Sequence, residues 1–198
     1  MHIALMVKNY NKISKILREG LPTDKVVEYN ANEVSSALSE ADVVIPIVTK
    51  IAGNQLKNSK VKLIQQYGAG LDSIDLEGAS KNNIPVANVP AGGTGNAESV
   101  AELAITFMIM LSRNLSLTMD RFKQGKFGSS VGDCIWRRNV LILGYGAIGK
   151  EIAKRLSAFE VNITAVSRKI HSLTTKESKF APYRHLSIDD IEIALPKT

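Results

Sequence analysis

The stretch Val140-Leu141-Ile142-Leu143-Gly144-Tyr145-Gly146-Ala147-Ile148-Gly149 decides the fold of the second half of the chain. Its apolar start predicts a buried parallel strand, which leads directly into the pattern G-x-G-x-x-G. After the glycines, Ile148, Ile152 and Leu156 recur at four-residue spacing with charged residues between them, which predicts an amphipathic helix. A glycine-rich turn that opens a helix can hold a pyrophosphate on free N–H groups. The stretch therefore predicts a dinucleotide-binding turn.

Each glycine of this turn has a physical role in such a site. Gly144 permits the tight turn, Gly146 lets the backbone approach the phosphates, and Gly149 lets the helix lie close to the strand. Ala147 and Ile148 complete the predicted cofactor-binding backbone. The alternative is a glycine-rich turn that binds nothing, but a strand before the motif and a helix after it favour binding.

The next predicted strand, residues 161–166, ends at Ser167-Arg168-Lys169. A site for NAD usually has Asp or Glu here, which accepts a hydrogen bond from the ribose 2′-OH. Ser167 can instead hydrogen-bond a 2′-phosphate, and Arg168 can pair with it in bidentate fashion. These residues predict a preference for NADP(H), with NAD(H) possible. The alternative is that Arg168 and Lys169 belong to a solvated loop.

Composition excludes several classes of protein. The 198 residues suffice for one large or two small domains, and the net charge of +6 is spread without any run of five basic residues, so nucleic acid is not an expected partner. The most apolar segment, residues 100–111, is too short to cross a membrane. The one cysteine, Cys134, fits a reducing compartment and predicts a cytoplasmic protein. No metal site is predicted.

The first 90 residues alternate short apolar runs with helical segments, which predicts an α/β domain with a flavodoxin-like parallel sheet. The expected strands are residues 3–7, 26–29, 43–48, 62–66 and 86–89, and the expected helices are residues 12–18, 33–38, 54–58 and 76–82. We expect this domain to cover residues 1–92.

Residues 93–198 are expected to form the Rossmann nucleotide-binding domain. A long helix is predicted to begin with Asn96 as its cap. Because residues 97–111 are apolar almost all round, this helix is expected to be buried on most sides, between domains or in a dimer. Residues 115–138 are expected to form a second helix and a polar connector. A full Rossmann sheet has about six strands; only residues 191–195 offer a third strand, so this domain is expected to be incomplete.

Two further motifs carry a family resemblance. The first is Gln66-Tyr67-Gly68-Ala69-Gly70-Leu71-Asp72-Ser73-Ile74-Asp75, and the second is Asn88-Val89-Pro90 followed by Asn96-Ala97-Glu98-Ser99-Val100-Ala101-Glu102. With the glycine turn after them, the chain resembles the D-isomer-specific 2-hydroxyacid dehydrogenases over about residues 45–196. That family includes phosphoglycerate dehydrogenases, glyoxylate/hydroxypyruvate reductases and D-lactate dehydrogenases.

The resemblance implies further site residues. Gly68, Ala69 and Gly70 are expected to hold the substrate carboxylate, with Ala69 and Gly70 as backbone donors. The alternative is a structural turn in which Asp72 caps the element that follows. Ser99 is expected to contact a cofactor phosphate, although a locally satisfied helix-start residue is an equal alternative.

Near the end of the chain, Pro196 is expected in a strand-and-loop segment beside the adenine. In relatives, the substrate-clamping Arg, the acid/base His and the Glu that orients it lie beyond the point reached by Thr198. This chain has His2, His171 and His185, all expected at the surface, so no catalytic residue is predicted for it.

The resemblance thus implies an NAD(P)-dependent oxidoreductase for the CH–OH group of a D-2-hydroxy acid, working as a reductase of 2-oxoacids such as glyoxylate or hydroxypyruvate. The chain is expected to be a C-terminally truncated member, inactive alone, whose full-length form is a homodimer. The alternative is a non-catalytic dinucleotide-binding regulator or pseudoenzyme remnant. A relative acting on formate is a weaker option, because formate has no 2-hydroxyl group.

Overall fold

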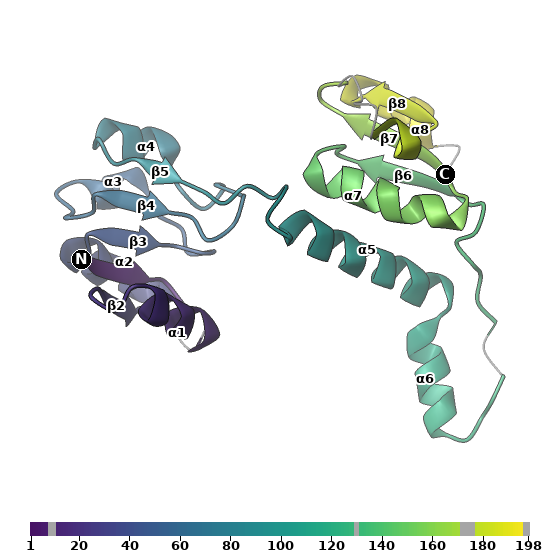
Figure 1. The fold of residues 1–198 in the computed structure, drawn as a ribbon, viewed down its shortest axis with the longest axis horizontal. Helices are drawn as coiled ribbons and strands as arrows, with labels where there is room; N and C mark the ends of the chain where they lie inside the picture. Colours follow the sequence, from purple (N-terminus) through teal and green to yellow (C-terminus); the bar gives the residue numbers. More distant parts are fainter. Residues whose placement is uncertain (8–10, 129–130, 171–176, 196–198) are drawn as a thin grey trace. The chain divides into compact units, whose positions relative to one another are not determined.

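The computed structural model describes residues 1–7, 11–128, 131–170 and 177–195. The chain forms two compact units, Met1–Pro90 and Ala91–Thr198 (Figure 1). The division falls after Pro90 rather than after residue 92. His171 and Pro196, both considered from the sequence, lie outside the described residues.

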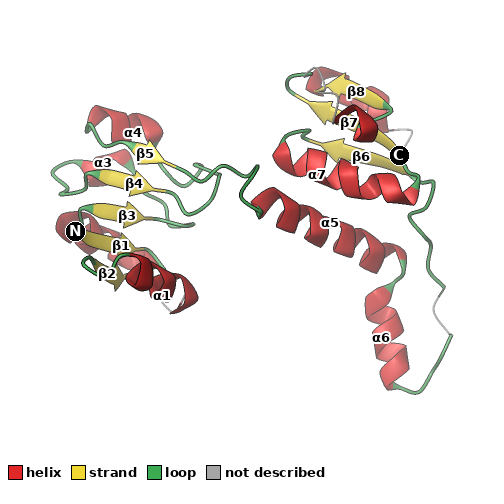
Figure 2. Ribbon diagram, viewed as in Figure 1, coloured by secondary structure: helices red, strands yellow, loops and turns green. Residues whose placement is uncertain are grey.

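The first unit contains a five-stranded sheet in which all pairs of strands are parallel (Figure 2). Its strands are β1 (His2–Leu5), β2 (Lys25–Glu28), β3 (Val43–Ile45), β4 (Leu63–Gln65) and β5 (Val86–Ala87). The order β2-β1-β3-β4-β5 is that of flavodoxin-like sheets. The predicted fold class is therefore confirmed for this unit.

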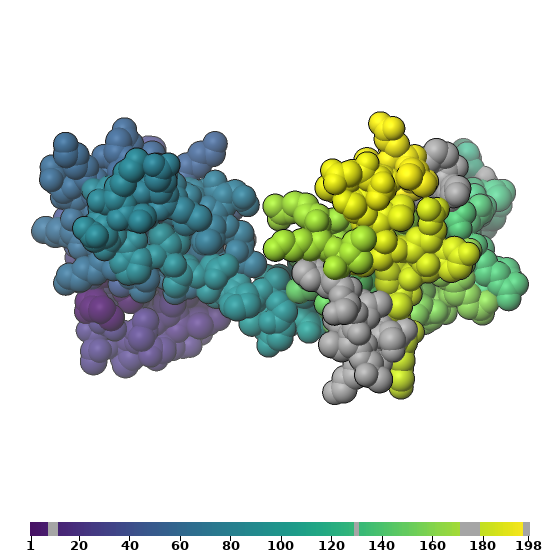
Figure 3. All heavy atoms as spheres, turned by 90° about the horizontal axis from the view of Figure 1, so that it is seen from above, coloured from purple at the N-terminus to yellow at the C-terminus, as the bar shows by residue number. Residues whose placement is uncertain are grey.

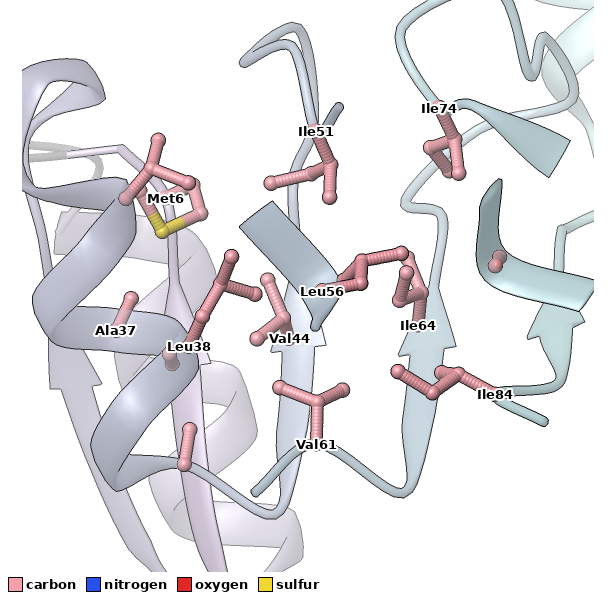
Figure 4. Packing of buried hydrophobic residues seen from close by; sticks show 14 of the residues in the cluster. Met6, Ala37, Leu38, Val44, Ile51, Leu56, Val61, Ile64, Ile74 and Ile84 are labelled. Atoms are coloured by element: carbon pink, nitrogen blue, oxygen red, sulfur yellow. The ribbon is translucent and has the colours of Figure 1, made fainter. Parts of the chain in front are cut away.

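Helices cover both faces of this sheet, because successive side chains of a strand point to opposite faces. The helices are α1 (Asn11–Gly20), α2 (Val34–Glu40), α3 (Gly53–Leu56) and α4 (Leu76–Lys81), and a 3₁₀ turn, η1 (Ala31–Glu33), precedes α2. Ile3 and Leu5 pack with Ile13 of α1. The alternate residues Ala4 and Val44 join the larger core that α2, α3 and α4 cover, shown in part in Figure 4.

The second unit has a three-stranded parallel sheet in the order β6-β7-β8. Its strands are β6 (Asn139–Leu143), β7 (Asn162–Ser167) and β8 (Arg184–Ser187). The helices are α5 (Asn96–Ser112), α6 (Leu115–Lys123), α7 (Ala147–Leu156) and α8 (Ile191–Ala194), with 3₁₀ turns η2 (Ser157–Phe159), η3 (Glu177–Phe180) and η4 (Ile188–Asp190). This parallel order is that of one half of a Rossmann sheet, so the α/β class is confirmed here too.

The prediction of a third strand at residues 191–195 is wrong. These residues contain α8, which directly follows η4. The side chain of Ser187 caps η4 by accepting a hydrogen bond from the N–H of Asp189. The third strand is β8 instead, whose polar sequence gives no strand pattern. β8 and α8 lie at the surface of the second unit in Figure 3, and Ile193 of α8 is 52% exposed.

The long helix α5 also differs from expectation. It begins at Asn96, and its cap is Gly95, which adopts a left-handed φ of 83°. One side of α5 is covered: Ala97 and Ala101 are buried, and Ile105 and Met108 pack against the core beside α7. Other apolar side chains of α5 are exposed: Leu103 is 51%, Phe107 52% and Leu111 78% exposed. Within its own unit the helix is buried only in part, because α7 covers only part of it; burial in a dimer or between domains stays a prediction.

Among the described residues, no single helix is both long and apolar enough to cross a bilayer. α5 and α6 have sufficient length and apolar composition only when taken together, as a pair bent by 63°.

Candidate functional site

The turn after β6 is held in a conformation that requires glycine at its first position. Gly144 has a φ of 97°, a left-handed conformation that other residues rarely adopt. Its N–H donates to the carbonyl of Val166 at 2.7 Å, which fastens the turn to β7. At Gly149, a Cβ atom would lie 2.2 Å from the carbonyl oxygen of Gly144. Helix α7 therefore lies against the strand end more closely than any side chain at this position allows.

The start of α7 presents free hydrogen-bond donors. No side chain caps the helix at Gly146, whose carbonyl accepts the first helical bond from the N–H of Lys150 at 2.9 Å. Within the described part of the chain, no acceptor is bonded to the N–H of Ala147, Ile148 or Gly149. With the positive end of the helix dipole, these donors form an environment that favours an anion.

A hollow of about 660 Å³ joins this turn to the end of β7. It is lined by Leu143, Gly144, Tyr145, Gly146, Val166, Ser167, Arg168, Lys169 and Ile188. Arg168 and Lys169 are exposed, and neither forms an ion pair with another described residue. The structure therefore brings together the glycine turn and the cations that follow β7.

Ser167 is engaged by a residue that sequence reasoning missed. Its Oγ lies 2.7 Å from the carbonyl oxygen of Lys169 and 2.7 Å from Nε2 of His185. Because a hydroxyl has one proton, donation to Lys169 leaves Ser167 to accept from His185. The ring of His185 also packs edge-on against Tyr145 at 5.1 Å between centroids.

The prediction of surface histidines is thus wrong for His185, which is half-buried because it lies on β8 beside β7. It is also wrong for His2, which is half-buried too, and whose ring contacts Tyr29 and the carbonyl of Glu40. His2 stands beside an apolar run and His185 in a polar segment, and neither pattern predicts these contacts.

A second hollow, of about 700 Å³, lies along α7 and the start of α5. Its lining includes Glu98, Ala147, Lys150, Lys154 and Phe180. Ser99 lines neither this hollow nor the one beside β7; it is exposed, and its N–H donates to the carbonyl of Gly95 at 3.0 Å. Ser99 is therefore not among the lining residues of either hollow, although its neighbour Glu98 lines the second one together with Ala147.

In the first unit, the loop Gly68-Ala69-Gly70 follows β4, and each of its carbonyls is occupied. The Gly68 carbonyl accepts from the N–H of Val89 at 3.1 Å, and the Ala69 carbonyl accepts from Nδ2 of Asn88 at 2.7 Å. The Gly70 carbonyl accepts from Nε2 of Gln66 at 2.9 Å. Among described residues, no acceptor is bonded to the N–H groups of Ala69 and Gly70. The loop therefore presents the N–H groups of Ala69 and Gly70 as donors, while its three carbonyl oxygens are already hydrogen-bonded within the unit.

Asp75, and not Asp72, caps the helix that follows this loop. Its carboxylate accepts from the N–H of Gly78 at 2.9 Å and from the N–H of Gly53 at 3.0 Å. These bonds, chiefly the one from Gly78, lower the pKa of Asp75. The alternative in which Asp72 caps the next element is therefore wrong.

Comparison with known proteins agrees with these motifs. The family model described as D-isomer specific 2-hydroxyacid dehydrogenase, catalytic domain, matches residues 4–181. The chain is 33% identical over 138 residues to the hydroxypyruvate reductase of Thermotoga maritima, covering 68% of this chain and 44% of the relative. It is 31% identical over 153 residues to the D-3-phosphoglycerate dehydrogenase of Methanocaldococcus jannaschii, covering 75% of this chain and 29% of the relative. The chain thus spans less than half the length of both relatives.

A solved structure shares the fold. The NAD-dependent formate dehydrogenase of Staphylococcus aureus, solved in complex with NAD, superposes with a TM-score of 0.73 at 22% identity. The match covers 96% of this chain and 62% of that one.

Proposed function

Because the chain belongs to the D-isomer specific 2-hydroxyacid dehydrogenase family, we propose that it binds a nicotinamide dinucleotide and a 2-oxo or 2-hydroxy acid for hydride transfer. The single observation that carries this proposal is the uncapped start of α7, where the N–H groups of Ala147, Ile148 and Gly149 have no acceptor among described residues. These donors, with the backbone of Gly144 and Gly146, would hold the pyrophosphate. A bound nicotinamide supplies or accepts the hydride.

The proposed cofactor preference is for NADP(H), with NAD(H) as the weaker ligand. Arg168 and Lys169 line the hollow beside the glycine turn and carry no ion-pair partner among described residues. They follow Ser167, which stands where a site for NAD usually has a carboxylate that would repel a 2′-phosphate. The Ser167 hydroxyl is held between Lys169 and His185, so we assign the main phosphate contact to Arg168. We keep Ser99 and Pro196 as proposed contacts of the phosphate and of the adenine edge.

The proposed substrate site is the loop Gly68-Ala69-Gly70. Its free N–H groups suit a carboxylate, the group that every 2-oxoacid and 2-hydroxy acid shares. Reduction also requires a proton at the substrate oxygen. Neither described histidine is proposed as its source, because His2 contacts Tyr29 and Glu40 and His185 contacts Ser167.

That engagement of both described histidines supports a second candidate function, a non-catalytic dinucleotide-binding regulator or pseudoenzyme remnant. The two candidates share the cofactor site and differ in turnover. Oxidation of NADPH by residues 1–198 in the presence of glyoxylate or hydroxypyruvate would favour the enzyme. Cofactor binding without turnover would favour the binding module.

We also propose that the protein is a cytoplasmic homodimer. The exposed apolar residues Leu103, Phe107 and Leu111 give α5 an uncovered face, and a large exposed apolar patch is typical of an interface. The only cysteine, Cys134, is exposed and free, which suits a reducing compartment.

Calorimetric titration of the chain with NADPH and with NADH tests the cofactor proposal. We expect NADPH to bind at least about tenfold more tightly, and Arg168→Ala to remove most of that difference, because a charge-assisted hydrogen bond contributes about 1.5–3 kcal/mol. Arg113→Ala is the matched control, since Arg113 is an exposed arginine of the same unit at the end of α5. A preference for NADH, or unchanged NADPH binding in Arg168→Ala, would refute the NADP(H) assignment.

A further inference from the structure

We propose that Gln66 is a positioning residue for carboxylate binding. Its buried amide joins the loop after β3 to the loop after β4, and so fixes the backbone from which Ala69 and Gly70 donate. The inference rests on the proposed function, because it assumes that these two N–H groups receive the carboxylate of the substrate.

The side chain of Gln66 is almost completely buried and fully hydrogen-bonded. It is 4% exposed. Its Nε2 donates to the carbonyl of Ile47 at 3.0 Å and to the carbonyl of Gly70 at 2.9 Å, with the Ser73 hydroxyl at 3.4 Å. Its Oε1 accepts from the N–H of Tyr67 at 2.8 Å. The two amide protons therefore serve two different loops, a geometry that an apolar side chain of the same length cannot reproduce.

One of those loops is strained at the residue that Gln66 contacts. Ile47 has a φ of 58°, which is a true outlier for a β-branched residue. Such a conformation persists only where the surroundings hold it, and it is concentrated at functional sites. The Gln66 amide donates to the carbonyl of Ile47 itself, and the N–H of Thr49 donates to the carbonyl of Pro46 at 2.9 Å. Gln66 is therefore part of what holds the loop after β3.

The two loops lie at the position where open parallel sheets bind ligands. β3 and β4 are adjacent parallel strands, and ligands of such sheets bind outside the carboxyl ends of the strands. Since one nitrogen bonds both oxygens, the carbonyls of Ile47 and Gly70 lie at most 5.9 Å apart. A free carbonyl would repel a carboxylate, so the bond from Gln66 to Gly70 occupies an acceptor and fixes the backbone of the residue whose N–H is proposed to bind.

The test is a titration of isotopically labelled protein with oxamate, an unreactive analogue of a 2-oxoacid, followed by the amide NMR signals of Ala69 and Gly70. In the unaltered chain we expect both signals to shift on binding. In Gln66→Met, which keeps the side-chain length but loses every hydrogen bond, we expect the Kd for oxamate to rise at least about tenfold. The matched control is Gln55→Met, which removes one exposed bond, from the N–H of Ala52, elsewhere in the same unit.

Three outcomes separate the inference from the function on which it rests. Weak binding in Gln66→Met alone, with the control unchanged, supports the positioning role. Binding by Gln66→Met within twofold of the unaltered chain overturns that role and leaves the carboxylate site standing. No shift of Ala69 and Gly70 in the unaltered chain overturns both. If Gln66→Met does not fold, Gln66→Glu decides by the same criterion, since it keeps the acceptor for Tyr67 and loses both donors.

Discussion

Replacement of Gly149 by alanine tests whether glycine is needed at this position because helix α7 packs against the turn, rather than because a ligand approaches the backbone there. The added Cβ would lie 2.2 Å from the carbonyl oxygen of Gly144 and 3.3 Å from Cγ2 of Ile142. Cβ contacts shorter than 3.0 Å essentially never occur, and here the nearest atom belongs to the backbone. Helix α7 must therefore move away from β6 by at least 0.8 Å at this point, the difference between 2.2 and 3.0 Å.

The cost follows from what α7 buries. Ala153 and Leu156 are completely buried between this helix and the sheet, and a gap of 0.5–1 Å already forfeits about a quarter to a half of each contact energy. Overpacking of this kind costs up to about 3 kcal/mol, and the better helix propensity of alanine returns about 1 kcal/mol. The net loss of about 2 kcal/mol predicts that the melting temperature of the second unit falls by about 10 °C.

Gly146→Ala is the matched control, because a Cβ at Gly146 meets nothing within 4 Å and its φ of −85° suits alanine. We expect this variant to melt like the unaltered chain and yet to lose most of its NADPH affinity, since the methyl group occupies the path of the pyrophosphate. The fluorescence of Trp136, the only tryptophan, follows the melting of the second unit, to which it belongs.

Two results would refute this reasoning. If Gly149→Ala melts within about 2 °C of the unaltered chain, the close contact with Gly144 does not limit the fold. If Gly146→Ala binds NADPH as tightly as the unaltered chain, the pyrophosphate does not approach the turn at this residue. Far-UV circular dichroism checks that each variant is folded at the titration temperature.

Two further predictions concern stability and assembly. Burial, followed by the hydrogen bond that Tyr29 donates to Glu40, raises the pKa of Tyr29 from 10.0 to about 12; because the neutral phenol is favoured in the folded state, its stabilisation is complete below pH 10 and is lost as the pH rises to about 12. The melting temperature of Tyr29→Phe should therefore fall less between pH 9 and pH 12 than that of the unaltered chain, and equal slopes would contradict this. Phe107→Glu, which places a charge on the exposed face of α5, should convert the proposed dimer to a monomer in light scattering, and an unchanged mass would count against that interface.

The sequence predicts those helices and strands in which apolar residues recur at a constant spacing along the whole element. In the first unit every expected strand and helix occurs, with shifted ends. The glycine turn was also predictable, because backbone constraints are visible in residue type: Gly144 has a left-handed φ and Gly149 contacts backbone. Such requirements arise from neighbours a few positions away, so a single short stretch contains them.

The features that the sequence did not predict depend on partners far along the chain. β8 has the polar sequence Arg184-His185-Leu186-Ser187 and is a strand because β7 pairs with it. α5 is apolar almost all round, but within its unit it packs mainly against α7, which leaves Leu103, Phe107 and Leu111 exposed. Periodicity reports which faces could be buried, whereas the number of neighbouring elements determines which faces are buried.

The residues that hold the candidate sites in place escaped prediction for a related reason. Gln66 and His185 each act through a contact with a loop or strand that the chain brings near only after folding: Gln66 bonds Ile47, and His185 bonds Ser167 across 18 positions. Neither residue belongs to a pattern that requires its side chain, since the motifs specify the backbone that binds and not the groups that orient it. In both units the donors proposed for the pyrophosphate and for the substrate carboxylate are backbone N–H groups, and only the 2′-phosphate is assigned to a side chain, that of Arg168. The side chains of Gln66 and His185 occupy a carbonyl and a hydroxyl beside the proposed sites, and the sequence motifs do not encode these contacts.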